Sequence, residues 1–246
     1  MVKIFQSSTF SGIGPRTQMQ DVGSVRKLPR KNQFWCIVCD GIGGQPGGAE
    51  AANICVNTYD HFLRNSLARK MVDKTVDFLK LGMLPVMDAF YSHMQHNPAH
   101  EHMGCTFALA YVEENIATLC WCGDSRIYVF RNGRMYFKSL PHNPAFDDYR
   151  EGKISLKQAE NHKTNIITRS ISVEAAFPIL EFKKVELQSG DKIMVCTDGV
   201  CNKISSDNFK NLAKTDEFDK TINQLKKELI KEAEDNYWGW IGEVIV

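Results

Sequence analysis

The chain has 246 residues, of which 43% are hydrophobic and 24% are charged, and its formal net charge is +1. This composition is typical of one large globular domain or two small ones, and the balanced charge argues against nucleic acid or an anionic membrane as a partner. No apolar run approaches the roughly 20 residues of a membrane helix, and the first ten residues lack an apolar signal core. We therefore expect a cytoplasmic protein.

Apolar runs and turn signals predict the elements of the first half of the chain. Short apolar or alternating runs predict three strands, at 3–10, 22–28 and 34–40. Apolar residues at helical spacing predict a helix over 48–64 with one buried face, and a second helical region over 71–96. Gly82 and Pro85 interrupt that second region, so we expect a break there with Pro85 in the first turn of the next helix.

The second half changes to strands joined by tight turns. Strands are predicted at 106–112, 116–121, 127–131 and 135–138, with Asn132-Gly133 as a hairpin turn. Consecutive strands without intervening helices indicate antiparallel sheets. A polar, helical insertion follows at about 141–172, including a helix over 157–162. The remaining elements are expected as strands at 180–187 and 193–198, helices at 206–213 and 216–234, and a strand at 241–246.

These elements predict one α+β domain over residues 1–246. Helices cluster after the strand that ends at Asp40 and after the strand that ends at Asp198. This order suits a four-layer α-β-β-α sandwich with a central antiparallel β-sandwich and a helical insertion.

Three aspartates stand at the ends of apolar runs. Asp40 and Asp198 are each followed by glycine, and Asp124 follows Gly123. Glycine allows backbone angles and close approaches that other residues resist. A carboxylate beside such a turn can hold a ligand, and three of them suggest a polynuclear metal site. The alternative is that the aspartates only cap turns.

The eight cysteines allow two interpretations. Cys36 and Cys39 have CxxC spacing, and similar short spacings separate Cys120 from Cys122 and Cys196 from Cys201. A zinc or redox site is one interpretation. The favoured one is that these thiols pack as small hydrophobic side chains in strands. Strand alternation would place Cys36 and Cys39 on opposite faces of their strand, which argues against a site built on the CxxC pair.

Seven motifs occur in an order that resembles the metal-dependent Ser/Thr protein phosphatase family, type 2C, in its bacterial form. They cover nearly the whole chain: Gly14-Pro15-Arg16 with Gln20-Asp21, Asp40-Gly41-Ile42-Gly43-Gly44, Gly104-Cys105-Thr106, Gly123-Asp124-Ser125-Arg126, Gly190-Asp191, Thr197-Asp198-Gly199 and Asp235-Asn236.

The resemblance implies a Mn²⁺- or Mg²⁺-dependent hydrolysis of phosphoserine and phosphothreonine, by direct attack of a water that bridges two ions. The residues that match the family's metal ligands are the carboxylates of Asp21, Asp40, Asp198 and Asp235 and the carbonyl of Gly41, with Asp124 for a third, weaker ion. Oxygen ligands suit such hard ions. Arg16 matches the residue that grips the substrate phosphate, so Arg16, Asp40 and Asp198 are the expected catalytic residues. The insertion at 141–172 matches the family's flap.

The resemblance also implies phosphoprotein substrates and a cognate Ser/Thr kinase as counterpart, and we expect a monomer. A catalytically silent, phosphatase-like binding or scaffold module is the alternative. Such a module would be expected to lose ligands or Arg16, and all of them are present here.

Four positions depart from the family pattern. Ile42 cannot donate a proton, so the leaving group must receive one from elsewhere. Cys105 replaces a threonine, and His142 lies in an altered motif, where we expect a structural role. The segment after Asn236 is the most divergent, and a shifted alignment there would replace Asp235 by Glu234 or Glu243.

Overall fold

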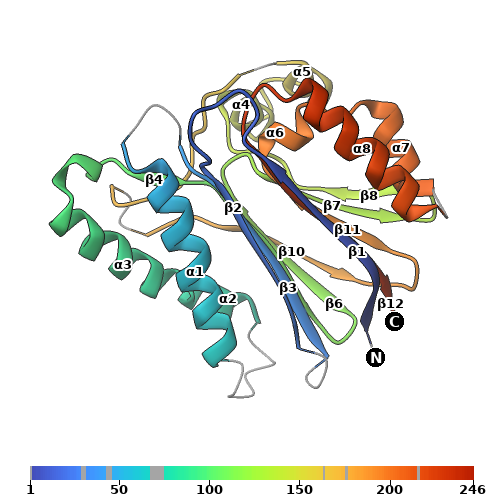
Figure 1. Cartoon of the computed structure of the whole chain (residues 1–246), viewed down its shortest axis with the longest axis horizontal. Helices are drawn as coiled ribbons and strands as arrows, with labels where there is room; N and C mark the ends of the chain where they lie inside the picture. Colours follow the sequence, from blue (N-terminus) through green and yellow to red (C-terminus); the bar gives the residue numbers. More distant parts are fainter. Residues whose placement is uncertain are drawn as a thin grey trace.

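The computed structural model describes residues 2–28, 32–42, 46–66, 75–162, 164–174, 177–214 and 217–246. Two five-stranded antiparallel sheets form its centre, with helices on both outer sides (Figure 1). One sheet has the strand order β1-β12-β11-β7-β8, and the other has the order β10-β6-β5-β3-β2. This arrangement confirms the predicted α+β sandwich.

The strands follow the predicted runs closely. Their bounds are β1 Lys3–Gly12, β2 Asp21–Leu28, β3 Gln33–Asp40, β4 Gly104–Cys105, β5 Phe107–Glu113, β6 Ile116–Cys122, β7 Arg126–Arg131, β8 Arg134–Lys138, β9 Ile171–Ser172, β10 Glu181–Glu186, β11 Lys192–Cys196 and β12 Tyr237–Ile245. The short strands β4 and β9 pair with each other. Asn132 (φ 50°) and Gly133 (φ 71°) both adopt positive φ, as a two-residue hairpin turn requires.

The helices lie in two groups on opposite sides of the sandwich (Figure 1). Their bounds are α1 Gly48–Ser66, α2 Thr75–Leu81, α3 Met83–His96, α4 Pro144–Arg150, α5 Leu156–Asn161, α6 Asp198–Cys201, α7 Ser206–Lys214 and α8 Phe218–Glu232, with a 3-10 turn, η3, at Pro98–His100. The break between α2 and α3 falls at Gly82, as predicted, with Pro85 in the first turn of α3. None of the described helices is long and apolar enough to cross a membrane.

Three apolar cores separate the four layers. Trp35, Ile37 and Cys39 of β3 pack against the helices α1 to α3, whereas Phe34 and Cys36 of the same strand pack between the two sheets. A third core joins the other sheet to α6, α7 and α8. Because β3 is buried on both faces, its sequence is a continuous apolar run and not an alternating one.

The structure corrects two details of the expectations. The last strand, predicted at 241–246, begins at Tyr237, because Trp238 and Trp240 lie in register with Ser11 and Thr9 of β1. The strand expected to end at Asp198 stops at Cys196, and Asp198 opens the short helix α6. Parts of two predicted helices, namely 71–74 and 216, and the last two residues of the motif at 40–44 lie outside the described residues.

The insertion at 141–172 contains two short helices. Asn143 caps α4 by accepting a hydrogen bond from the backbone N–H of Phe146, and Ser155 caps α5. These helices have a small apolar cluster of their own, made by Ala145, Phe146 and Ala159. The insertion is thus helical as expected, whereas its last residues form strand β9.

Candidate metal centre

The fold brings the strand-end aspartates to one end of the sandwich. Asp21 and Asp40 stand directly opposite each other in the β2–β3 register. Asp198 follows β11 and Asp235 precedes β12, so the second sheet contributes two more carboxylates. Asp124 lies in the connection from β6 to β7, which passes from one sheet to the other. Both sheets therefore contribute aspartates to one cluster.

The carboxylates are close enough to perturb one another. The side chain of Asp40 lies close enough to those of Asp21 and Asp198 for each to shift the pKa of the others. Burial raises the pKa of Asp40 well above its ordinary value, and the charges of Asp21, Asp198 and Asp124 raise it further. Burial also raises the pKa of Asp21 to about 7, with added repulsion from Asp198 and Asp235. Clustered, buried carboxylates are costly to ionise unless cations accompany them.

The pKa of Asp124 is raised less, to about 6. Burial is the largest cause and the charge of Asp198 adds to it, whereas the cation of Arg126 opposes both. Arg126 donates from Nε to the backbone carbonyl of Asp124 over 2.9 Å. Asp124 therefore borders the cluster and has an arginine beside it.

The donor set fits hard divalent cations. Asp21 is 3% exposed, and its Oδ2 has no hydrogen-bond partner among the described residues. A buried carboxylate oxygen without a partner is rare, because leaving it unpaired costs free energy. The surrounding side chains offer oxygen ligands, which Mg²⁺ and Mn²⁺ prefer. Divalent ions would satisfy Asp21 and neutralise the cluster at the same time.

Gly41 lies between Asp40 and the start of α1. Its N–H donates to the carbonyl of Gln20 over 3.0 Å. A Cβ atom on Gly41 would come within 2.3 Å of the carbonyl oxygen of Gly48, so only glycine allows this close approach. The structure thus brings the predicted backbone ligand next to the carboxylates and gives a physical reason for the glycine.

Arg16 forms an ion pair with Asp235. The Nη2–Oδ2 distance is 2.6 Å, and the two side chains are 55% and 42% exposed. An ion pair this exposed contributes little to stability and exchanges readily with solvent. Arg16 is therefore a half-exposed cation at the edge of the carboxylate cluster.

Three residues without an assigned role in the sequence analysis support the aspartates. Asn236 is buried, accepts from the N–H of Gln20 and donates to the carbonyl of Ile13, so it ties the β1–β2 loop to the Asp235 segment. Thr106 accepts from the N–H of Asp40 over 3.0 Å.

Thr197 is the third of these residues. Its hydroxyl accepts from the N–H of Trp238 over 2.9 Å and donates to the carbonyl of the same residue over 3.3 Å, and its side chain lies beside Asp21. All three supporting residues lie within the motifs of the sequence analysis, and Thr197 and Asn236 directly adjoin Asp198 and Asp235. Their place in those motifs was the signal that could have identified them.

His142 has a structural environment, as expected. It is fully buried, and its Nδ1 accepts a hydrogen bond from the N–H of Gly123 over 3.0 Å. The proton is therefore on Nε2, which lies 3.1 Å from Oε1 of Glu181. His142 thereby holds the turn that carries Asp124.

The CxxC spacing does not make a site. Cys36 faces the core between the sheets and Cys39 faces the helices, so their side chains point to opposite faces of β3. Cys120 and Cys122, two residues apart on β6, both face the helices.

The chain belongs to the protein phosphatase 2C family, whose model matches residues 16–234. The serine/threonine phosphatase stp of Listeria welshimeri is 25% identical over 201 residues, which are 81% of this chain and 79% of that protein. Protein phosphatase PhpP of Streptococcus pneumoniae is 26% identical over 208 residues, covering 82% of this chain and 80% of that protein. The family recognised from the motifs is thus confirmed.

A solved structure has the same fold. It is the catalytic domain of the serine threonine protein phosphatase PstP in complex with two manganese ions, with a TM-score of 0.78 and 20% identity, covering 100% of both chains.

Proposed function

We propose that this chain is a Mn²⁺- or Mg²⁺-dependent serine/threonine protein phosphatase that hydrolyses phosphoserine and phosphothreonine. The observation that carries the proposal is the meeting of the buried Asp21 with the half-buried Asp40 and Asp198, from both sheets, in one cluster with a half-exposed arginine at its edge. Membership of the protein phosphatase 2C family supports the same activity.

In this proposal the aspartates hold the ions. Asp21, Asp40, Asp198 and Asp235 bind two ions together with the carbonyl of Gly41. Such a pair supplies Lewis acidity that lowers the pKa of a water and neutralises charge on the phosphoryl group. Asp124 binds a third, weaker ion, because Arg126 beside it already compensates part of its charge.

Arg16 binds the substrate phosphate. Its planar guanidinium can donate two parallel hydrogen bonds to a phosphate, and its exposure leaves it accessible to a phosphoprotein side chain. When the carboxylate of Asp235 binds a metal ion, its ion pair with Arg16 becomes weaker. The guanidinium is then available to the substrate.

The alternative is a phosphatase-like module that binds partners without turnover. Three observations favour activity: the complete set of aspartates, the Oδ2 of Asp21 that has no partner among the described residues, and the half-exposed Arg16. Phosphoprotein substrates, a Ser/Thr kinase as counterpart and a monomeric, cytoplasmic state belong to the same proposal. The flap at 141–172, which borders the Asp124 turn through His142, is proposed to shape substrate choice.

Hydrolysis of a phosphothreonine peptide tests the proposal. We expect turnover with Mn²⁺ or Mg²⁺ that stops with a chelator. Asp198→Asn should lower the rate by more than roughly 100-fold. Loss of a residue that only hydrogen-bonds to a metal ligand can already lower activity roughly 100-fold, and Asp198 is proposed to be a ligand itself. Asp191→Asn is the matched control, because Asp191 adjoins the other end of β11 and should leave turnover intact when the protein is folded.

Full activity of Asp198→Asn, or activity after complete chelation, would overturn the metal-dependent mechanism. Folded wild-type protein that hydrolyses nothing with either ion would instead establish the binding-module alternative.

A further inference from the structure

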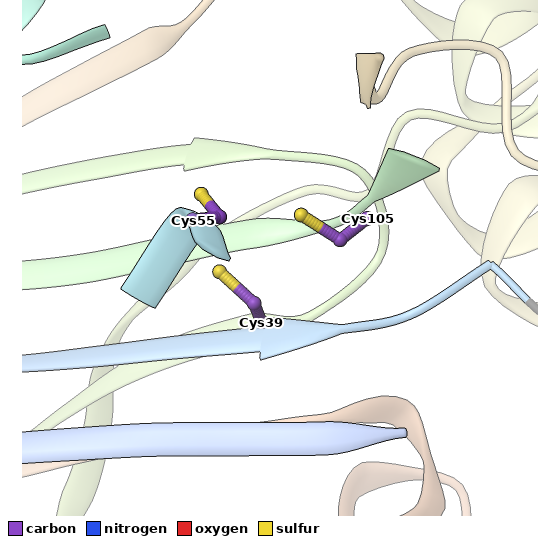
Figure 2. A group of neighbouring side chains, drawn as sticks. All are labelled: Cys39, Cys55 and Cys105. Carbon is purple, nitrogen blue, oxygen red and sulfur yellow. The ribbon is translucent and has the colours of Figure 1, made fainter. Parts of the chain in front are cut away.

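Three buried thiols from distant parts of the sequence meet behind the metal centre. Cys39 on β3, Cys55 on α1 and Cys105 on β4 are each fully buried, and their Sγ atoms all lie within 4.8 Å of one another. Figure 2 shows the three sulfurs gathered between α1 and the ends of the two strands. Their convergence has no counterpart in the paired cysteine spacings of the sequence.

The spacing of the sulfurs suits an ion better than a disulfide. Three thiolates at about 2.3 Å from a common ion are about 4 Å apart. A disulfide instead needs an S–S distance of about 2.05 Å and Cα atoms no more than about 6.8 Å apart. Cys105 pairs with Gly41, so Cys39 lies diagonally from it across the ladder. Diagonal residues have Cα atoms about 7–8 Å apart.

The chemistry of the donors selects the ion. All three ligand atoms are sulfur, which hard ions such as Mg²⁺ avoid and soft ions prefer. Structural zinc sites are closed by four ligands. The group found in the described part of the chain offers three, which suits a soft ion of low coordination number.

We propose that Cys39, Cys55 and Cys105 form a binding site for a soft, thiophilic metal ion, Cu⁺, distinct from the oxygen-lined centre for hard divalent ions. Hydrogen bonds from Cys105 and Cys39 lower the pKa of the Cys55 thiol against the effect of its burial. Burial raises the pKa of the Cys39 and Cys105 thiols, so a bound ion would have to displace their protons.

The position of the site couples it to the metal centre. Cys39 precedes Asp40, and Cys105 pairs with Gly41. Cys55 lies on α1, whose first residue, Gly48, packs closely against Gly41. A bound ion would join the three elements that frame this side of the carboxylate cluster. Binding should therefore raise the thermal unfolding temperature, and it does not depend on phosphatase activity.

Titration of the reduced full chain with Cu⁺ under argon, against a competing Cu⁺ chelator, tests the site. We expect one tightly bound Cu⁺ per chain, a higher unfolding temperature, and X-ray absorption that reports three sulfur ligands. Cys39→Ala, Cys55→Ala and Cys105→Ala should each weaken binding by more than the roughly 10–100-fold that loss of an outer partner costs.

Cys36→Ala is the matched control. Cys36 is as buried as Cys39 on the same strand but faces the other core, so its replacement should leave Cu⁺ affinity unchanged. Failure of folded wild-type protein to retain Cu⁺ would overturn the proposal. Oxygen or nitrogen ligands in the absorption spectrum, or equal weakening by Cys36→Ala, would do the same. The wild-type spectrum decides the question even where an alanine variant folds poorly.

Discussion

Asp21→Asn is expected to stabilise the chain in a chelating buffer, although it removes a proposed metal ligand. The Asp21 carboxylate is buried, its Oδ2 has no partner among the described residues, and its pKa is raised from 3.8 to about 7. That difference corresponds to a free-energy cost of about 4 kcal/mol for ionising Asp21 in the folded chain relative to the unfolded chain. Asparagine has a similar shape and carries no charge, so we expect a gain of about 2–4 kcal/mol at pH 8.

The sign of the pH dependence follows from the raised pKa. Without metal, the folded chain retains the Asp21 proton to a higher pH than the unfolded chain does. The stability contributed by the protonated form is complete below the unfolded value of 3.8 and is lost as the pH rises through about 7. The advantage of Asp21→Asn should therefore shrink as the pH falls from 8 to 5.

Urea unfolding followed by tryptophan fluorescence, with EDTA and then with Mn²⁺, measures these effects. Mn²⁺ at 100 times its Kd should stabilise wild type by about 2.7 kcal/mol and the variant by less. Asp191→Asn is the control: Asp191 is equally buried but accepts two hydrogen bonds from Arg131, so the variant should lose roughly 3 kcal/mol. If Asp21→Asn were no more stable than wild type in EDTA at pH 8, the reasoning from uncompensated carboxylates would be refuted.

Three further outcomes are expected from other contacts. Asn236→Ala should lower stability by about 2 kcal/mol and weaken Mn²⁺ binding roughly 10-fold or more, measured by urea unfolding and calorimetry, because Asn236 ties two loops at the centre. Burial raises the pKa of Glu181, but His142, whose Nε2 lies 3.1 Å from the carboxylate, and the nearby arginines outweigh it and hold the pKa below its ordinary 4.5. The stability that Glu181 adds over Glu181→Gln should thus be present at pH 7 and disappear as the pH falls below about 4 in unfolding series; a pH-independent difference would contradict this. Gly199→Ala places a Cβ atom 1.9 Å from the carbonyl oxygen of Asn236 and should lower the stability by about 3 kcal/mol or more. Gly152→Ala, at φ 73° with open space around it, should lower the stability by only about 1 kcal/mol. Equal losses of stability in thermal unfolding would argue against the steric reason.

Local patterns were sufficient for most elements and for part of the site. Asn132-Gly133 predicted its hairpin because both residues tolerate positive φ, and the apolar run to Asp40 predicted β3 because a strand buried on both faces needs no polar alternation. The helix α4 was not predicted individually, although Asn143 followed by Pro144 is a helix-start signal. The polar composition of the insertion obscured it.

Long-range contacts could not be predicted from the sequence. The register that sets Asp21 opposite Asp40 depends on the whole β2–β3 pairing, and the Arg16–Asp235 ion pair joins residues 219 positions apart. The cysteines show the same limit. Their spacing drew attention to Cys36, whereas packing of α1 on the sheet brings Cys55 to Cys39 instead.

The position of β12 in its sheet has a consequence for synthesis on the ribosome. β12 lies between β1 and β11, so the first strand of the chain pairs with the last (Figure 1). Until β12 leaves the ribosome, β1 lacks this neighbour and β11 keeps only its pairing with β7. Domains usually fold as they emerge, yet this sheet can close only after β12 has left the ribosome. The nascent chain therefore exposes two unpaired strand edges until β12 has emerged, and such edges can pair with other chains during that interval.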